Sequence, residues 1–450
     1  MTNVVKIRKG LNIHLKGKAE KVKSQVEMSD SFGLSPESFP GLKPKVLVRE
    51  GDHVKAGEPL FADKSCQEVT FASPVSGIVT AVVRGDRRKV LNVVVKPDAE
   101  QEFADFGVKD VEAMAGSDVI AALLKAGLFG YINQLPYDVV TSPEHLPKAI
   151  FVSALRDKPL ASDFEFELLG NENDFQTGLT ALSKIAKTYL GIGRNQSSEC
   201  LRRAKNVDVN VFDGPCPAGN VGVQINHLDP VNKGEVVWTV EPTAVIFFGR
   251  LFNSGKVNLK RTIAIAGSEV TEPVYADVLV GQKISSILKG RISDNSSHMR
   301  IINGNVLTGR KCTLDDYLDA HASEVTVIPE GDNADELLGW IMPRLKQYST
   351  SRSYFSWLSG GKEYALDARV KGGERHMIMS GEYDKVIPMD IYPEFLVKAV
   401  IAGDIEKMEA LGIYEVSPED FALAEFVDSS KLELQSIIRR GLDMLRKENS

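Results

Sequence analysis

Cysteine and histidine, the side chains that most often hold metals or carry redox chemistry, are few and scattered along this chain. Its 450 residues contain four cysteines, Cys66, Cys200, Cys216 and Cys312, and seven histidines. The sequence has no CxxC pair, no histidine three or four residues from a cysteine, and no two histidines four residues apart. Zinc and iron–sulfur sites need such spacings, so the sequence predicts no metal ligand, and it offers no catalytic residue.

The most distinctive segment is FDGPCPAGNVG at residues 212–222, which ends an expected strand over residues 206–212. Proline fixes φ, and glycine lets the backbone approach another surface closely, so the loop should be rigid yet thin. Such a loop after a strand is where α/β sheets usually bind ligands, and it also suits a contact between domains. Both interpretations stay open, and the candidate residues are Phe212, Asp213, Gly214, Pro217, Gly219 and Gly222.

This loop differs from a dinucleotide-binding fingerprint. The pattern GxGxxG is absent, and no helix pattern is expected directly after the loop. Asp213 is expected to accept hydrogen bonds from the loop's own amides. A second pair, Gly191 and Gly193, has no third glycine beside it and is expected to form the turn that ends a helix.

Charge and hydropathy limit the kinds of partner. Lys and Arg total 54 against 61 Asp and Glu, and the net charge of −7 would repel a phosphate backbone, so nucleic acid is a poor candidate. The longest apolar runs fall far short of the roughly 20 residues that a membrane-spanning helix needs. The first ten residues also lack the apolar core of a signal peptide.

The elements that must position these residues fall into four parts, which make the chain an α/β multidomain protein. Residues 1–103 show two similar β-rich halves with turns at Gly51 and Gly85, which predicts a biotinyl/lipoyl-like β barrel. Residues 104–256 alternate helical and strand patterns, which predicts a Rossmann-like α/β domain. Residues 257–330 should form a β-grasp-like (SLBB-like) module, and residues 331–450 a helical domain.

The helical domain has legible start and stop signals. Gly403 and Gly412 are expected to end two helices, and Ser417 is expected to open another. Ser430 and Glu433 should form the capping box of the last helix, whose apolar stripe consists of Leu434, Ile437, Ile438, Leu442 and Leu445.

The barrel raises the question of a carrier function. Lipoyl and biotinyl domains carry their cofactor on a lysine at a hairpin tip, and Lys64 follows Asp63 in a suggestive position. The spacing from Gly51 is short for that hairpin, so Lys64 is expected off the tip and without a lipoyl or biotinyl group.

Several further segments occur in a fixed order between residues 41 and 427: GLKPKVLVREGDHVKAGEPL, FASPVSGIV, FDGPCPAGNVG, RIINGNVLTG, MDIYPEFLVKAVIAGD and GIYEVSPEDFALAEFV. Together they resemble one family over nearly the whole chain, the A subunit of the sodium-translocating NADH:quinone oxidoreductase. That family is related to the flavin- and NADH-binding subunit of complex I and to the C subunit of the Rnf complex. The resemblance implies a complex at the bacterial inner membrane that oxidises NADH, reduces quinone and exports sodium.

The cofactor motifs of those relatives are not matched here. Where they hold flavin phosphate in a glycine-rich loop, this chain has KAGLFGYIN at residues 125–133, in which Leu128, Phe129, Tyr131 and Ile132 crowd the approach. No cysteine follows Cys312. The resemblance therefore implies a subunit without a cofactor, with flavins and iron–sulfur centres in partner subunits.

The same resemblance implies a peripheral subunit on the cytoplasmic face of the inner membrane. Its partners would be the other subunits, especially the integral membrane ones, with quinone as a further candidate at the loop of residues 212–222. It would be an enzyme only as part of the complex. A free-standing flavin-dependent NADH dehydrogenase and a lipoyl-like carrier or scaffold protein remain as alternatives.

Overall fold

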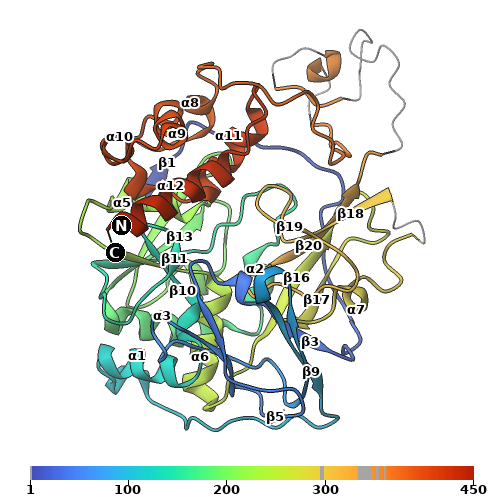
Figure 1. The fold of residues 1–450 in the computed structure, drawn as a ribbon, viewed down its shortest axis with the longest axis vertical. Helices are drawn as coiled ribbons and strands as arrows, with labels where there is room; N and C mark the ends of the chain where they lie inside the picture. The colour runs from blue at the N-terminus through green and yellow to red at the C-terminus, as the bar shows by residue number, and fades with distance from the viewer. Residues whose placement is uncertain (1–2, 294–297, 333–346, 351–353, 359–360, 450) are drawn as a thin grey trace.

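The computed structural model describes residues 3–293, 298–332, 347–350, 354–358 and 361–449. Figure 1 shows the C-terminal helices gathered at one end of the molecule and the hairpins of the barrel at the other. Among the residues that the structure describes, no helix is both long and apolar enough to cross a membrane.

The central layer is a seven-stranded sheet. The first five strands in the order given below run parallel, and β12 (Ala149–Ser153) is buried along nearly its whole length, as expected for a parallel strand covered on both faces. The strand order is β1 (Asn3–Lys6), β14 (Asp208–Asp213), β13 (Lys187–Gly193), β12 (Ala149–Ser153), β15 (Val237–Val240), β10 (Ile132–Leu135) and β11 (Val139–Val140).

Helices cover both faces of this sheet. The helices α1 (Gly116–Lys125), α3 (Glu172–Ile185) and α6 (Pro242–Ser254) pack together over one large core, and α5 (Val221–Leu228) packs over a smaller core on β12 and β15. The short helices α2 (Phe164–Leu168) and α4 (Glu199–Arg202) lie in the connections. Strand β13 contains Gly191 and Gly193, so the expectation of a helix-ending turn there is wrong: α3 already ends at Ile185.

A second, six-stranded mixed sheet stands beside the first. Its order is β19 (Arg310–Cys312), β18 (Met299–Asn303), β20 (Glu324–Pro329), β16 (Lys260–Ala266), β17 (Val274–Leu279) and β2 (Glu20–Ser24), and α7 (Ile284–Leu288) packs in its core.

The predicted barrel consists of two small sheets. One contains β3 (Phe32–Leu34), β9 (Val90–Pro97), β8 (Gly77–Arg84) and β5 (His53–Val54); the other contains β4 (Pro44–Val46), β6 (Pro59–Asp63) and β7 (Thr70–Ala72). Lys64 directly follows β6, at the start of the connection to β7, and its amide donates to the carbonyl of Lys43 at 2.8 Å. That it carries no lipoyl or biotinyl group stays a prediction.

The N-terminal segment is shared among the parts of the molecule. Strand β1 extends the seven-stranded sheet beside β14, and β2 extends the six-stranded sheet beside β17. These first strands therefore pair with the two larger sheets and with neither of the two small sheets that form the barrel.

The C-terminal helices follow their expected signals closely. The helix α9 (Pro393–Ala402) is capped by Gly403 in the left-handed conformation, and α10 (Ile405–Ala410) ends just before Gly412. Ser417 forms a capping box with Asp420 ahead of α11 (Ala422–Val427). This part also contains α8 (Tyr383–Val386) and α12 (Leu434–Glu448).

The predicted capping box at Ser430 and Glu433 is wrong. The helix α12 begins at Leu434, one turn later than the box requires, and its N-cap residue Glu433 makes no side-chain cap bond. The Glu425 carboxylate accepts from the Gln435 amide in the first turn at 2.9 Å. The Ser430 hydroxyl instead accepts a hydrogen bond from the amide of Ile378 at 3.1 Å, which ties the preceding loop down.

Candidate functional site

The loop of residues 212–222 is held by its neighbours. The Asp213 carboxylate pairs with the Arg194 guanidinium at 2.5 Å, so the expectation that Asp213 serves the loop's amides is wrong. Those amides donate instead to two distant side chains: Gly219 N–H to the Asp157 carboxylate at 2.8 Å, and Cys216 N–H to the Asn12 side-chain oxygen at 3.0 Å.

The glycines of this loop allow close approach by three different segments. A β-carbon on Gly214 would lie 2.3 Å from the Ile7 carbonyl oxygen, one on Gly219 would lie 2.4 Å from that of Leu155, and one on Gly222 would lie 2.4 Å from the Asp420 carboxylate. None of the three has a positive φ. Close packing, and not an unusual backbone conformation, therefore requires glycine at these positions.

A helix does follow the loop directly, contrary to the sequence expectation. The helix α5 begins at Val221, and the side chain of Asn220 reaches the C-terminal part of the chain, donating to the Glu419 carbonyl and the Asp420 carboxylate at 3.3 Å each. Phe212 and Pro217 are buried, and the bond between Cys216 and Pro217 is cis. Burial raises the pKa of the Cys216 thiol, which suits a packing role.

The nearby cleft lies where the strand order of the central sheet reverses. From β12 the chain moves outward to β13 and β14, and then returns to β15 on the opposite side of β12. Ligands of open α/β sheets bind outside the carboxyl ends of the strands at such a point. The structure has a cleft of about 530 Å³ there.

All parts of the molecule contribute to the walls of this cleft. Ser153 and Arg156 come from the end of β12, Glu241 follows β15, and Gly219 comes from the loop of residues 212–222. The six-stranded sheet and its loops contribute Asn305, Arg310, Asp319, His321 and Glu324; the C-terminal helices contribute Glu419 and Gln435; and the barrel side contributes Glu37. Of the six predicted loop residues, only Gly219 lines the cleft.

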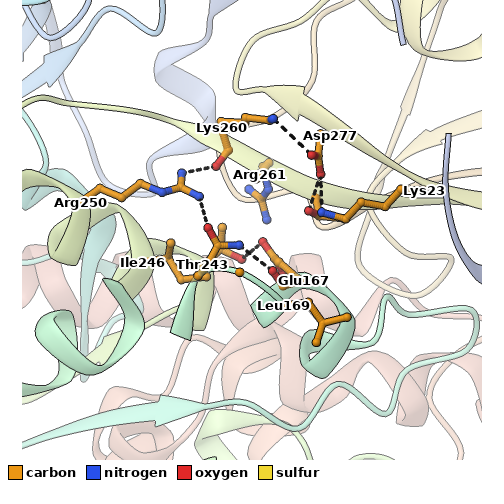
Figure 2. Close-up of a pocket in the computed structure, with 12 residues that line it drawn as sticks. Lys23, Glu167, Leu169, Thr243, Ile246, Arg250, Lys260, Arg261 and Asp277 are labelled. Atoms are coloured by element: carbon orange, nitrogen blue, oxygen red, sulfur yellow. Dashed lines mark hydrogen bonds and ion pairs between the residues drawn. The ribbon is translucent and has the colours of Figure 1, made fainter. Parts of the chain in front are cut away.

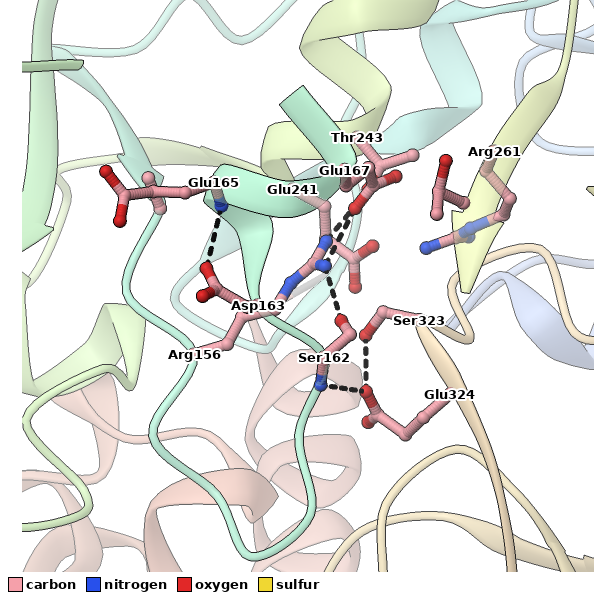
Figure 3. A network of polar contacts seen from close by, with 12 residues as sticks. Arg156, Ser162, Asp163, Glu165, Glu167, Glu241, Thr243, Arg261, Ser323 and Glu324 are labelled. Atoms are coloured by element: carbon pink, nitrogen blue, oxygen red, sulfur yellow. Dashed lines mark hydrogen bonds and ion pairs between the residues drawn. The ribbon is translucent and has the colours of Figure 1, made fainter. Parts of the chain in front are cut away.

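The cleft has an excess of negatively charged side chains. Seven carboxylate side chains face three cationic ones, Arg156, Lys158 and Arg310. Arg156 is already engaged: it donates to Glu167 at 2.8 Å, to the Ser162 hydroxyl at 2.7 Å and to the Thr243 hydroxyl at 2.8 Å (Figure 3). An anionic ligand would therefore meet a repelling surface.

Three buried polar atoms in the walls lack hydrogen-bond partners among the residues that the structure describes. They are the Tyr131 hydroxyl, the Asn133 side-chain oxygen and Nε2 of His321. Burial raises the pKa of Tyr131, so its hydroxyl stays protonated and can donate. Burial alone would lower the pKa of His321, but the Glu241 carboxylate, 3.7 Å from Nδ1, raises the pKa above its usual value. A neutral ligand with hydrogen-bonding groups would satisfy these atoms.

No sequence signal groups these three residues. The sequence shows Tyr131 only as a side chain that crowds the loop of residues 125–133, and His321 only as one of several scattered histidines. No local motif marks them, because they come together only when the six-stranded sheet packs against the central one. The sequence also gives no sign that Asn133 lies on a strand near the edge of the sheet.

The glycines of the 125–133 loop pack against the barrel. A β-carbon on Gly127 would lie 2.8 Å from the Ala72 amide nitrogen, and one on Gly130 would lie 2.2 Å from the Phe71 ring. Among the described residues, no group of three or more histidine, cysteine, aspartate or glutamate side chains is arranged to hold a metal ion.

Comparison with known proteins assigns the chain to a family. Three family models match it: the NqrA N-terminal barrel-sandwich hybrid domain at residues 5–98, the NqrA second alpha/beta domain at residues 114–257, and the NQRA C-terminal domain at residues 262–313. The first two matches confirm the predicted barrel and the predicted α/β domain in their coarse form.

Whole-length relatives agree with these models. The A subunit of the Na(+)-translocating NADH-quinone reductase of Neisseria meningitidis serogroup A is 34% identical over 99% of this chain and 100% of its own length. The same subunit of Pasteurella multocida is 35% identical and that of Haemophilus influenzae strain 86-028NP is 34% identical, both with the same coverage. The chain therefore belongs to the family formed by the A subunit of the Na(+)-translocating NADH-quinone reductase.

Proposed function

We propose that this chain works in the sodium-translocating NADH-quinone reductase as a subunit without a redox cofactor, and that its switch-point cleft takes the quinone ring. The complex is a translocase, and this chain contributes to that activity as one of its subunits. The quinone assignment rests on three buried polar atoms in the cleft walls that have no hydrogen-bond partner among the described residues: the Tyr131 hydroxyl, the Asn133 side-chain oxygen and His321 Nε2.

The packing of the glycines in the loop of residues 125–133 supports the absence of a cofactor. In a flavin cradle the loop amides must face a phosphate, whereas Gly127 and Gly130 press against Ala72 and Phe71. The seven carboxylates of the cleft also disfavour flavin and dinucleotide phosphates. The residues present do not fit such a group.

We also propose a Rossmann-like fold for residues 104–256 and a β-grasp-like fold for residues 257–330. The parallel order β14, β13, β12, β15 follows the 3-2-1-4 order of a Rossmann-like sheet, which supports that description of residues 104–256. The mixed sheet around α7 supports a β-grasp-like description of residues 257–330.

A quinone ring suits the chemistry of the cleft. It is neutral, so the carboxylates do not repel it, and its two carbonyl oxygens accept hydrogen bonds. The Tyr131 hydroxyl can donate to one of them, and His321 Nε2 can donate when it carries a proton. The Asn133 side-chain oxygen can accept a bond from the reduced ring, whose oxygens carry hydrogens.

Family membership also supports the placement of the subunit. We propose that it is peripheral and lies on the cytoplasmic side of the membrane, where NADH is available, in contact with the integral membrane subunits of the complex. The packed loop of residues 212–222 would then act mainly within the subunit, since most of its residues are covered by other parts of this chain.

The test uses the assembled complex with Tyr131→Phe, which removes one hydroxyl and keeps the ring. Loss of a hydrogen bond of roughly 0.5–1.5 kcal/mol should raise the KM for quinone about 2- to 10-fold. NADH oxidation with an artificial electron acceptor should stay unchanged. Tyr392→Phe, at an exposed tyrosine before α9, is the matched control. An unaltered KM for quinone in Tyr131→Phe would contradict the proposal that quinone binds in this cleft.

A further inference from the structure

A second, smaller cleft separates the central sheet's helices from the six-stranded sheet. It has a volume of about 170 Å³, whereas a single buried water needs only about 10–15 Å³. Its walls come from β2, from α2 and the turn that follows it, from α6, and from β16 and β17 (Figure 2). The cleft is thus built where the N-terminal segment meets two of the larger units.

The lining of this cleft carries an excess of positive charge. Four cationic side chains, Lys23, Arg250, Lys260 and Arg261, face two carboxylates, Glu167 and Asp277. The larger switch-point cleft has the opposite sign. The two clefts therefore select different ligands.

Both carboxylates are already bound by other groups. Asp277 lies between the ammonium groups of Lys23 at 2.9 Å and Lys260 at 3.2 Å, and it accepts a third bond from the Thr262 hydroxyl at 2.6 Å. Glu167 accepts from Arg156 at 2.8 Å and from Thr243 at 2.9 Å. Neither carboxylate accepts a hydrogen bond from the two arginines of the cleft.

Arg250 serves mainly as a structural clamp. It donates to the carbonyl oxygens of Asn258 and Lys260 and to the Asn171 side chain, and the Asp174 carboxylate lies 3.6 Å from its Nε. Burial lowers the pKa of Arg250, and the carboxylates of Asp174, Glu167 and Asp277 offset only part of that effect.

Arg261 is the unusual residue. The residue is 3% exposed, and Nη1 donates to the Ala320 carbonyl at 2.8 Å. Its Nε and Nη2 groups have no hydrogen-bond partner within the part of the chain that the structure describes. Glu241 lies within electrostatic reach: despite burial, its pKa is lowered, by His321 first and then by Arg261 and Arg156. Glu241 nevertheless accepts no hydrogen bond from this guanidinium.

We propose that the smaller cleft binds a tetrahedral oxyanion of the phosphate class, with Nε and Nη2 of Arg261 as its buried donors. Adjacent N–H groups of a guanidinium match two oxygens of such an anion, and leaving them buried and unpaired is costly. Lys23 and Lys260, whose side chains are 38% and 53% exposed, stand at the mouth and supply further positive charge. The bound anion would link β2, β16 and α6.

The test is calorimetric titration of the purified full chain with inorganic phosphate, at fixed ionic strength in an anion-poor buffer. We expect one phosphate per chain and a melting temperature that rises with phosphate concentration. Lys23→Ala with Lys260→Ala should weaken binding about tenfold. Arg261→Lys, which keeps the charge and loses the fork, should weaken it by a similar factor.

Asp277→Asn is the most discriminating variant. It removes a negative charge from the wall and should tighten phosphate binding severalfold, an effect that damage to the fold would not produce. Lys289→Ala, which breaks an exposed ion pair with Glu27 outside the cleft, is the control and should bind phosphate like the parent chain. No heat and no thermal shift at millimolar phosphate would overturn the proposal. So would equal binding by the parent chain, the Lys23/Lys260 variant and Asp277→Asn.

Discussion

Gly219 lies where the 212–222 loop touches the segment after β12. A valine there would place its β-carbon 2.4 Å from the Leu155 carbonyl oxygen and 2.7 Å from the Asp157 carboxylate, so one of the two segments must move. Overpacking of this kind costs about 1–3 kcal/mol. We expect Gly219→Val to lower the free energy of unfolding by that amount and to reduce co-purification with the complex and its quinone reductase activity.

The control for Gly219→Val is Gly373→Val. Gly373 has no positive φ, and a β-carbon there would meet no atom within 4 Å, so this valine should be tolerated. Urea unfolding and subunit co-purification compare the two variants. If Gly219→Val behaves like Gly373→Val, the loop is an ordinary connection and close approach at Gly219 is unimportant.

Glu330 offers a pH test at the end of the six-stranded sheet. Its carboxylate accepts bonds from Arg300 at 2.6 and 3.1 Å and from Lys311 at 3.0 Å, and these contacts lower the pKa of Glu330 from 4.5 to about 2. A lowered pKa means that the contacts stabilise the fold above pH 4.5 and that this stabilisation is lost as the pH falls toward 2.

Glu330→Gln should therefore cost on the order of 1 kcal/mol of unfolding free energy at pH 7 and progressively less below pH 4.5. Urea unfolding at about pH 7 and about pH 3.5 measures the difference. Glu100→Gln, at an exposed position after β9, should show no such pH-dependent gap. A gap for Glu330→Gln that is independent of pH would contradict the ion-pair explanation.

The structure confirms the apolar stripe predicted for the helix α12. The stripe Leu434, Ile437, Ile438, Leu442 and Leu445 is buried along its whole length, as the periodicity predicts. Leu442→Ala should cost about 2–5 kcal/mol of unfolding free energy, because a fully buried side chain leaves a cavity. Arg440→Ala, on the exposed face of the same helix, should change it by about 0.5 kcal/mol or less. Similar losses for the two variants would contradict the packing of this stripe.

The sequence predicts elements well where the signal is local. Gly403 and the Ser417 capping box mark real helix ends, because caps depend on residues within one turn. The Ser430 capping box fails because the Ser430 hydroxyl has a distant partner, the amide of Ile378. The expectation of a helix-ending turn at Gly191 is wrong for a similar reason. A β-carbon there would lie 1.9 Å from the Gln224 side chain, so this glycine allows close packing inside a strand.

The candidate site was predictable only in part. The sequence located the loop of residues 212–222 at the end of a strand, and Gly219 does line the cleft. Tyr131, Asn133 and His321 could not be grouped, because residues nearly two hundred positions apart meet only through the packing of two sheets. The partner expected for Asp213 is wrong, because its true partner, Arg194, lies on a neighbouring strand connection.

For the whole molecule, the proposed absence of a cofactor gives a direct prediction. The purified chain should be colourless and should not oxidise NADH, since Gly127 and Gly130 pack on the barrel and the cleft is acidic. Visible absorbance and an NADH oxidation assay on the isolated chain measure this, with the complete complex as the positive control. Stoichiometric flavin in the isolated chain would contradict the prediction.

The N-terminal segment joins parts of the molecule that are distant in the sequence. Strand β1 pairs with β14 of the central sheet, and β2 pairs with β17 of the six-stranded sheet. Between them, the Lys16 amide donates to the Tyr364 carbonyl and the Tyr364 amide donates to the His14 carbonyl, both at 2.9 Å. One short stretch thus contacts three units outside the barrel.

Deleting residues 1–28 removes all three contacts and leaves every barrel strand in place. The clusters of buried side chains keep most of their members, although the one under the C-terminal helices loses Ile7, Ile13 and Leu15. The units should therefore still fold, but they lose much of what makes them unfold together. We expect the single unfolding transition of the full chain to separate into at least two, followed by circular dichroism and by tryptophan fluorescence, with Trp238 as a reporter in the central sheet. Val4→Ala, at a side chain that is 53% exposed, should keep one transition. If the deleted chain also unfolds in one coincident step, the interfaces between the larger units suffice for cooperativity and the N-terminal strands are dispensable.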